Sequence, residues 1–204
     1  FAEGVMKPIV VRPSLLRGGQ AWAALLVLLL AVGAVRMVAS YAFNRRADGE
    51  RNRMQFDAAL ADYAMSVRCD GSNWSPCLGM AHLRQIQSFW SLDAEGKRTA
   101  AREAETLYQE TLHRNPWETD AQFGMSKLYE GTGEKEKSLA VLEDLVARIP
   151  HQRAYLSELG LRLRQMGRYE DALKRFEEAS RVENTEMIDI NIRWLREKLG
   201  EAAP

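Results

Sequence analysis

The stretch QMGRYEDALKRFEEA, residues 165–179, decides the fold of this 204-residue chain. Ala172, Phe176 and Ala179 follow one another at spacings of four and three residues, which places them on one face of an α-helix. Gly167 stands just before that helix, where a glycine can adopt the positive φ of a tight turn between two helices. The stretch therefore predicts a helix, a glycine turn and a second helix.

The same pattern occurs 34 residues earlier, which indicates a repeat rather than a single hairpin. Met125, Gly133, Ser138 and Leu142 occupy the positions that Leu159, Gly167, Ala172 and Phe176 hold in the later copy. The prolines at 116 and 150 are also one period apart, and each is expected to end a helix. Since one such hairpin cannot bury its own apolar face, the copies must stack on one another.

A third, degenerate copy lies one period further back, where Ala104 and Tyr108 match Ser138 and Leu142. We expect its two helices at Met80–Leu92 and Thr99–Arg114, joined by residues 93–98 without the usual glycine turn. At the other end, apolar residues recur on one side of a helix expected over residues 186–199, which Gly200 would end. This last helix would cap the stack.

The pattern resembles the tetratricopeptide repeat over roughly residues 85–185 and is most specific in the last copy. The resemblance implies an all-α fold, with about three helix pairs and a capping helix forming a short solenoid over residues 80–200. In that family the first helix of each repeat lines a groove that holds peptides or partner helices. Carried over by register, the groove residues are Phe123, Lys127, Glu130, Ser157, Leu161, Arg164 and Asn191.

Lys127 and Arg164 fall about one repeat apart, so the two cations are expected to face one groove. Together they would clamp an acidic segment or a C-terminal carboxylate, with Phe123 and Leu161 as an apolar floor. The alternative is that both are solubilising charges on the surface of ordinary helices.

The apolar stretch at residues 21–43 is expected to form a transmembrane helix, and residues 1–20 would be a short tail before it. No charged residue occurs from Gly18 to Val35, and the apolar character resumes after Arg36. A helix over 21–43 would be roughly 35 Å long, enough for a hydrocarbon core of about 30 Å. Arg36 would then snorkel to the polar boundary or pair with a partner. A cleaved signal peptide is the alternative, but its apolar region is normally shorter.

Residues 44–79 are expected to form a hinge, a helix and a loop. Phe56, Leu60, Tyr63 and Val67 recur at helical spacing between residues 49 and 67. This helix either packs on the solenoid as an N-terminal cap or continues the transmembrane helix as a stalk. Asp48-Gly49 would be the hinge of the stalk, and the glycine favours that interpretation.

Cys69 and Cys77 bracket a polar, turn-rich loop, and we expect a disulfide between them rather than two free thiols. A disulfide indicates an oxidising compartment. It would place the protein in a bacterial inner membrane with the C-terminal domain in the periplasm. Basic residues flank both ends of the apolar segment, so their distribution does not choose an orientation.

The sequence contains no motif that indicates catalysis. Its 28 basic and 28 acidic residues cancel, whereas a nucleic-acid-binding protein carries a basic surplus. His82, His113 and His151 fall on separate expected helices without metal-ligand spacing, and no phosphate-binding loop or nucleophile motif is present. We therefore expect no enzyme activity, cofactor, metal, nucleic acid or small-molecule substrate.

The sequence thus predicts a non-catalytic, membrane-anchored scaffold, an accessory subunit that docks a protein partner in a membrane complex. The alternative is a chaperone-like assembly factor, of the cytochrome-maturation or pilus and secretion type, that captures client segments transiently.

Overall fold

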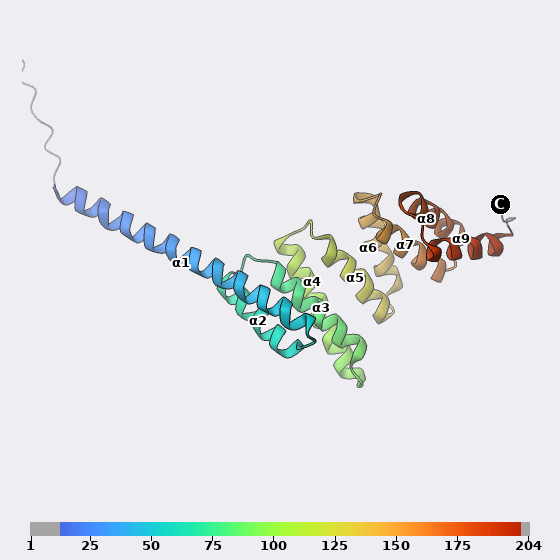
Figure 1. Ribbon diagram of the computed structural model, residues 1–204, viewed down its shortest axis with the longest axis horizontal. Helices are drawn as coiled ribbons and strands as arrows, with labels where there is room; N and C mark the ends of the chain where they lie inside the picture. The colour runs from blue at the N-terminus through green and yellow to red at the C-terminus, as the bar shows by residue number, and fades with distance from the viewer. Residues whose placement is uncertain (1–12, 201–204) are drawn as a thin grey trace, which may run out of the picture.

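The computed structural model describes the backbone of residues 13–200, with side chains from residue 20 onward, and this part of the chain is entirely helical (Figure 1). The all-α fold is confirmed, and there are more helices than the expected three pairs and a cap. They are α1 (Pro13–Asn52), α2 (Phe56–Cys69), α3 (Ser75–Trp90), α4 (Ala94–Arg114), α5 (Thr119–Thr132), α6 (Lys135–Arg148), α7 (Arg153–Gln165), α8 (Tyr169–Val182) and α9 (Glu186–Leu199).

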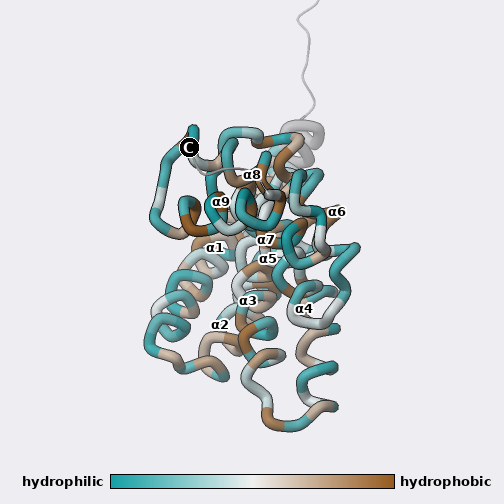
Figure 2. Tube along the Cα trace, turned by 90° about the vertical axis from the view of Figure 1, so that its right-hand side faces the viewer, coloured by the Kyte–Doolittle hydropathy of each residue, from teal (hydrophilic) through white to brown (hydrophobic). Residues whose placement is uncertain are grey.

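Consecutive helices pair into hairpins that stack into a short solenoid. The second half of α1 pairs with α2, α3 with α4, α5 with α6, and α7 with α8, and α9 packs on α8. The first half of α1 extends away from this stack as a free helix, at the left of Figure 1. In the view of Figure 2 the hydrophobic stretches of the tube lie mostly between neighbouring helices, as a stacked core requires.

Glycines in the left-handed region end three of the helices as expected. The φ angles are 83° at Gly133, 78° at Gly167 and 72° at Gly200. The bounds of α9 agree with the expected capping helix. The degenerate copy differs, because α4 begins at Ala94 rather than near residue 99. Asp93 is its N-cap, and the Asp93 carboxylate accepts the backbone N–H of Gly96 at 2.6 Å.

Buried aromatic rings pack against helical glycines throughout the stack. A Cβ placed at Gly160 would lie 2.9 Å from the ring of Phe176, and one at Gly124 would lie 2.5 Å from the ring of Tyr108. Tyr63 meets Gly79 in the same way. The rings therefore fill space that any larger residue would occupy, and Phe176 belongs to the core.

The expected hinge at Asp48-Gly49 is wrong, because α1 runs without interruption through both residues to Asn52. The chain reverses at residues 53–55 instead, where Met54 has a φ of 60°. The returning α2 holds α1 in helical form: the Tyr63 hydroxyl donates to Asp48 at 2.5 Å, and Ala47 is fully buried. The observed arrangement is the alternative of a helix packed on the solenoid.

Arg36 contacts two carbonyls of the chain itself. Its Nε donates to the carbonyl of Cys69 at 2.9 Å, and its Nη2 donates to the carbonyl of Arg68 at 3.3 Å. These two carbonyls lie at the C-terminus of α2, which otherwise leaves them without helical partners. Residues 37–43, expected within the membrane, therefore lie beside the C-terminal part of α2, where Ser40 bonds Ser66.

The expected Cys69–Cys77 disulfide is not formed, and both cysteines are free. The loop between them is shorter than expected, since Ser75 and Pro76 begin α3 and proline favours the first helical turn. Cys77 is buried, and its Sγ accepts from Arg114 on α4 at 3.1 Å. Burial also raises the pKa of the Cys77 thiol, so the protonated form is favoured.

Candidate functional site

The expected groove residues come from the first helices of successive hairpins and from the last helix. Phe123, Lys127 and Glu130 lie on α5, Ser157, Leu161 and Arg164 lie on α7, and Asn191 lies on α9. We call these seven residues the α5–α7–α9 face.

At the α5 end, an aromatic pair forms the base of the face. The rings of Phe123 and Tyr155 lie 5.1 Å apart, and the Lys127 Nζ lies 4.6 Å from the centre of the Phe123 ring. Such a cation–π contact orients the ammonium group while it stays in water. Lys127 is exposed, so this cation is available to a partner.

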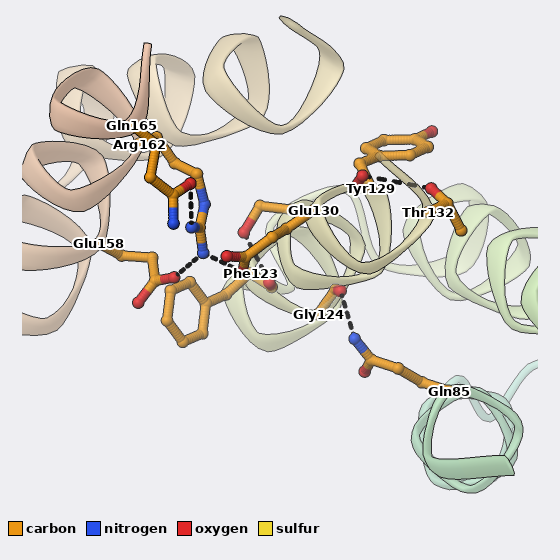
Figure 3. A network of polar contacts seen from close by, with 10 residues as sticks. Gln85, Phe123, Gly124, Tyr129, Glu130, Thr132, Glu158, Arg162 and Gln165 are labelled. Atoms are coloured by element: carbon orange, nitrogen blue, oxygen red, sulfur yellow. Dashed lines mark hydrogen bonds and ion pairs between the residues drawn. The ribbon is translucent and has the colours of Figure 1, made fainter. Parts of the chain in front are cut away.

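Between α5 and α7 lies a buried cation that sequence reasoning missed. Arg162 is only 3% exposed, and its guanidinium pairs with Glu130 and Glu158 and bonds Gln165 at 2.9 Å (Figure 3). The Glu130 carboxylate is therefore engaged with α7. Leu128 holds the equivalent place one repeat earlier and is also buried, so an arginine at an apolar position of the repeat was the available signal.

Arg164 has partners of its own at the other end of the face. Its Nη1 donates to the Asn191 side-chain oxygen, and the guanidinium carbon lies 5.4 Å from the centre of the Trp194 ring. Asn191 is itself buried, and its amide donates to the Met187 carbonyl at 2.7 Å. Arg164 and Lys127 thus have separate neighbours and share no partner among the described residues.

The remaining two residues are half-buried. Leu161 packs against the core of the C-terminal hairpins, and the Ser157 hydroxyl is buried without a protein partner among the described residues. The face therefore has an apolar and aromatic side around Phe123 and Leu161, an exposed cation at Lys127, and a polar network beneath that fixes α5 against α7.

The histidines do not gather into a site. His82 lies edge-on to Tyr108 with ring centres 5.7 Å apart, and desolvation lowers the pKa of its imidazole. Within residues 20–200, whose side chains are described, no group of three His, Cys, Asp or Glu side chains has the placement of a metal site.

Comparison with known proteins gives a fold but no close relative. No protein-family model and no curated protein match the sequence. Among solved structures, YrrB, described as a TPR protein with an unusual peptide-binding site, superposes with a TM-score of 0.60 at 14% identity. The match covers 78% of this chain and 76% of YrrB. The fold is that of a tetratricopeptide-repeat protein.

Two further tetratricopeptide-type structures agree. TTC0263 from Thermus thermophilus, described as a thermophilic TPR protein, gives a TM-score of 0.65 at 16% identity, covering 76% of this chain and 80% of its own. PilF from Pseudomonas aeruginosa gives 0.66 at 17% identity, covering 81% and 71%. At these identities the likeness concerns the fold alone.

Proposed function

We propose that this protein is a non-catalytic scaffold, an accessory subunit that α1 anchors in a membrane complex and that docks a protein partner through the α5–α7–α9 face. The observation that carries the proposal is the first half of α1. Its apolar side chains have no cover from the fold: Leu26 is 59% exposed and Leu30 is 65% exposed. An uncovered apolar helix of this length needs an apolar environment, and a bilayer supplies one.

The proposed span is shorter than residues 21–43 and begins earlier. Arg36 is fixed to the polar C-terminus of α2, so the hydrocarbon region has to end near Val35. The uncharged stretch 18–35 then measures roughly 27 Å as a helix, close to the thickness of the hydrocarbon core. Arg17 and Arg36 would lie at its two boundaries, where arginine is tolerated.

The docking chemistry of the face follows from its contacts. Phe123 and Leu161 offer apolar surface, and Lys127 offers an exposed cation whose ammonium is already oriented. Arg164 contacts Asn191 and Trp194. We therefore propose that it forms one edge of the face and does not bind a partner carboxylate together with Lys127. A partner segment with an apolar residue beside an acidic one fits this arrangement.

The test is capture of the partner from membranes with the full chain as bait. Lys127→Glu together with Phe123→Ala should sharply reduce the co-purified partner, since both contacts would be lost. The control pair is Lys174→Glu with Arg181→Glu, two exposed cations on α8 outside the face. Equal recovery of the partner with both pairs would refute docking through this face while leaving the anchor untouched.

The second candidate function is a chaperone-like assembly factor that captures client segments. The exposed Lys127 and the half-buried Phe123 ring beside it also suit brief capture of extended segments. Stoichiometry separates the two roles: an accessory subunit co-purifies one to one, whereas an assembly factor is recovered below stoichiometry and only while its client is being made.

The periplasmic location of the repeats was inferred from the expected disulfide. Because that disulfide is not formed, the inference has no support. Labelling of Cys69 in intact cells with a membrane-impermeant maleimide reads the orientation directly. A label there places the repeats outside the inner membrane, and labelling only after lysis places them inside.

A further inference from the structure

A second candidate binding site lies outside the α5–α7–α9 face, in a cleft between the end of α3, the start of α4 and the end of α5. We call it the distal cleft. Its cavity measures about 410 Å³, and its walls include Phe89, Ala101, Leu128 and Tyr129. A Cβ at Gly131 would overlap the Phe89 ring, so the glycine leaves the space in which Phe89 packs against α5 and forms one wall.

Basic side chains without ion-pair partners form the rim of this cleft. Lys97, Arg98 and Arg102 all line it from α4 and are all exposed. None of the ion pairs among the described side chains includes them. Three nearby acids have other contacts: Glu103 pairs with Arg84, Glu134 with Lys137, and Glu105 accepts the Tyr129 hydroxyl at 2.8 Å.

Three cations therefore line the cleft against two carboxylates, Glu105 and Glu134, and Glu134 is paired with Lys137. The lining keeps a positive balance on a chain whose formal net charge is zero. Three free cations around an apolar hollow complement a ligand that carries both apolar groups and carboxylates. The cations and the hollow come from three different helices, so the fold rather than one helix assembles the site.

Further apolar side chains are exposed at the turn between α3 and α4, where Trp90 lines a separate hollow. Trp90 is 71% exposed, and Leu92 has no cover from the rest of the fold. Figure 2 shows a hydrophobic segment at this turn, at the lower end of the view. Exposed apolar side chains rimmed by charged residues mark protein interaction sites, so the cleft and the neighbouring turn favour a protein segment as the ligand.

The position of the cleft favours a protein over a lipid, on the proposed assignment of α1 as the anchor. α3 begins where Ser75 bonds Asn44 of α1, and its 16 residues carry the chain about 24 Å further. Figure 1 shows the turn between α3 and α4 at the lower edge of the stack, away from the free part of α1. A bilayer crossed by α1 would therefore not reach the cleft.

From this combination we infer that the distal cleft binds an acidic amphipathic segment of a partner protein, with its apolar side chains in the hollow and its carboxylates on Lys97, Arg98 and Arg102. None of the residues that line this cleft belongs to the α5–α7–α9 face, so the scaffold holds two separate docking surfaces. Either can operate without the other.

The experiment uses the full chain in detergent micelles and a fluorescein-labelled amphipathic peptide with Leu and Phe on one side and Glu on the other. A twin peptide with Lys in place of Glu is the charge control. Fluorescence anisotropy should show the Glu peptide binding with a dissociation constant below about 1 mM, and the twin binding at least about tenfold more weakly.

Two kinds of variant locate the binding. The triple change Lys97→Glu, Arg98→Glu and Arg102→Glu should weaken it at least about tenfold, and so should Ala94→Trp, which fills the rim of the hollow. The matched control changes three exposed, unpaired cations on α8 and α9 to Glu (Lys174, Arg181 and Arg193) and should leave binding unchanged.

Several results would overturn the inference. One is no binding of the Glu peptide at about 1 mM, the weak limit of specific association, and another is equal binding of the two peptides. Undiminished binding by the cleft variants would also overturn it. Cleft-dependent binding of phosphatidylglycerol vesicles without peptide binding would replace the protein segment by a lipid surface. Because Phe123 and Lys127 stay unchanged in every variant, failure here leaves the proposed docking face standing.

Discussion

Replacing Arg162 with leucine tests whether the buried ion-pair network is needed to hold α5 against α7. The substitution restores the residue type found one repeat earlier at Leu128, so a sequence comparison alone would regard it as harmless. The structure predicts the opposite, because the change leaves Glu130 and Glu158 facing each other without a cation.

The size of the effect follows from the exposure of the three groups. Breaking a fully buried pair costs about 3–5 kcal/mol, and Arg162 itself is buried. The Glu158 side chain is 18% exposed and the Glu130 side chain is 37% exposed, so water can partly solvate the two carboxylates that have lost their cation. We therefore expect a loss of about 2–3 kcal/mol in the free energy of unfolding.

Urea unfolding of the full chain in detergent, followed by circular dichroism, measures this loss. The matched variant combines Arg162→Leu with Glu130→Gln and Glu158→Gln, which removes the uncompensated charge and should recover most of the lost stability. If the single and the triple variant unfold at the same urea concentration, the unpaired carboxylates carry no cost and the reasoning is refuted.

Three further predictions concern the core, the pH dependence and the anchor. Phe176→Ala should cost about 3–5 kcal/mol because the ring is fully buried, and an unchanged melting temperature would show that the assigned repeat register is wrong. Desolvation lowers the pKa of His82, so the unfolded chain binds a proton more readily; stability should fall as pH drops below about 6.5, and His82→Gln should reduce that fall in urea unfolding at pH 7.5 and 5. Carbonate extraction should leave the full-length chain in the membrane pellet, whereas its release into the supernatant would rule out α1 as a transmembrane anchor.

The sequence predicts those parts of the fold in which one residue type meets one local requirement. Gly133, Gly167 and Gly200 end helices with a positive φ, which a glycine adopts without steric cost. Phe176 belongs to the core because its place in the repeat faces the neighbouring helix. These features depend on backbone geometry and on a period, and both can be read along a single chain.

Features that depend on contacts between distant segments could not be predicted in this way. Gly49 inside a helix costs only about 1 kcal/mol, and the packing of α2 against α1 is enough to keep the helix continuous there. Cys77 pairs with Arg114, which lies 37 residues further along the chain, and not with the nearby Cys69. Arg162 bonds Glu130, which lies 32 residues earlier in the chain, and the residues next to either one do not indicate that bond.

Because of these long-range contacts, one continuous helix, α1, is both half of the first hairpin and the proposed anchor. The expected hinge at Gly49 does not divide the two parts. From Arg36 onward the helix is half of the first hairpin: Arg36 caps α2, Ser40 bonds Ser66, and Asp48 accepts from Tyr63. Before Arg36 the same unbroken helix forms the proposed anchor. Since α1 is continuous between the two parts, a tilt of the anchor has to carry the first hairpin with it, and the stacked hairpins after it follow through the contacts between consecutive helices. A partner docked on this scaffold would therefore be held at a set angle to the bilayer, which a tether with a hinge at Gly49 would not achieve.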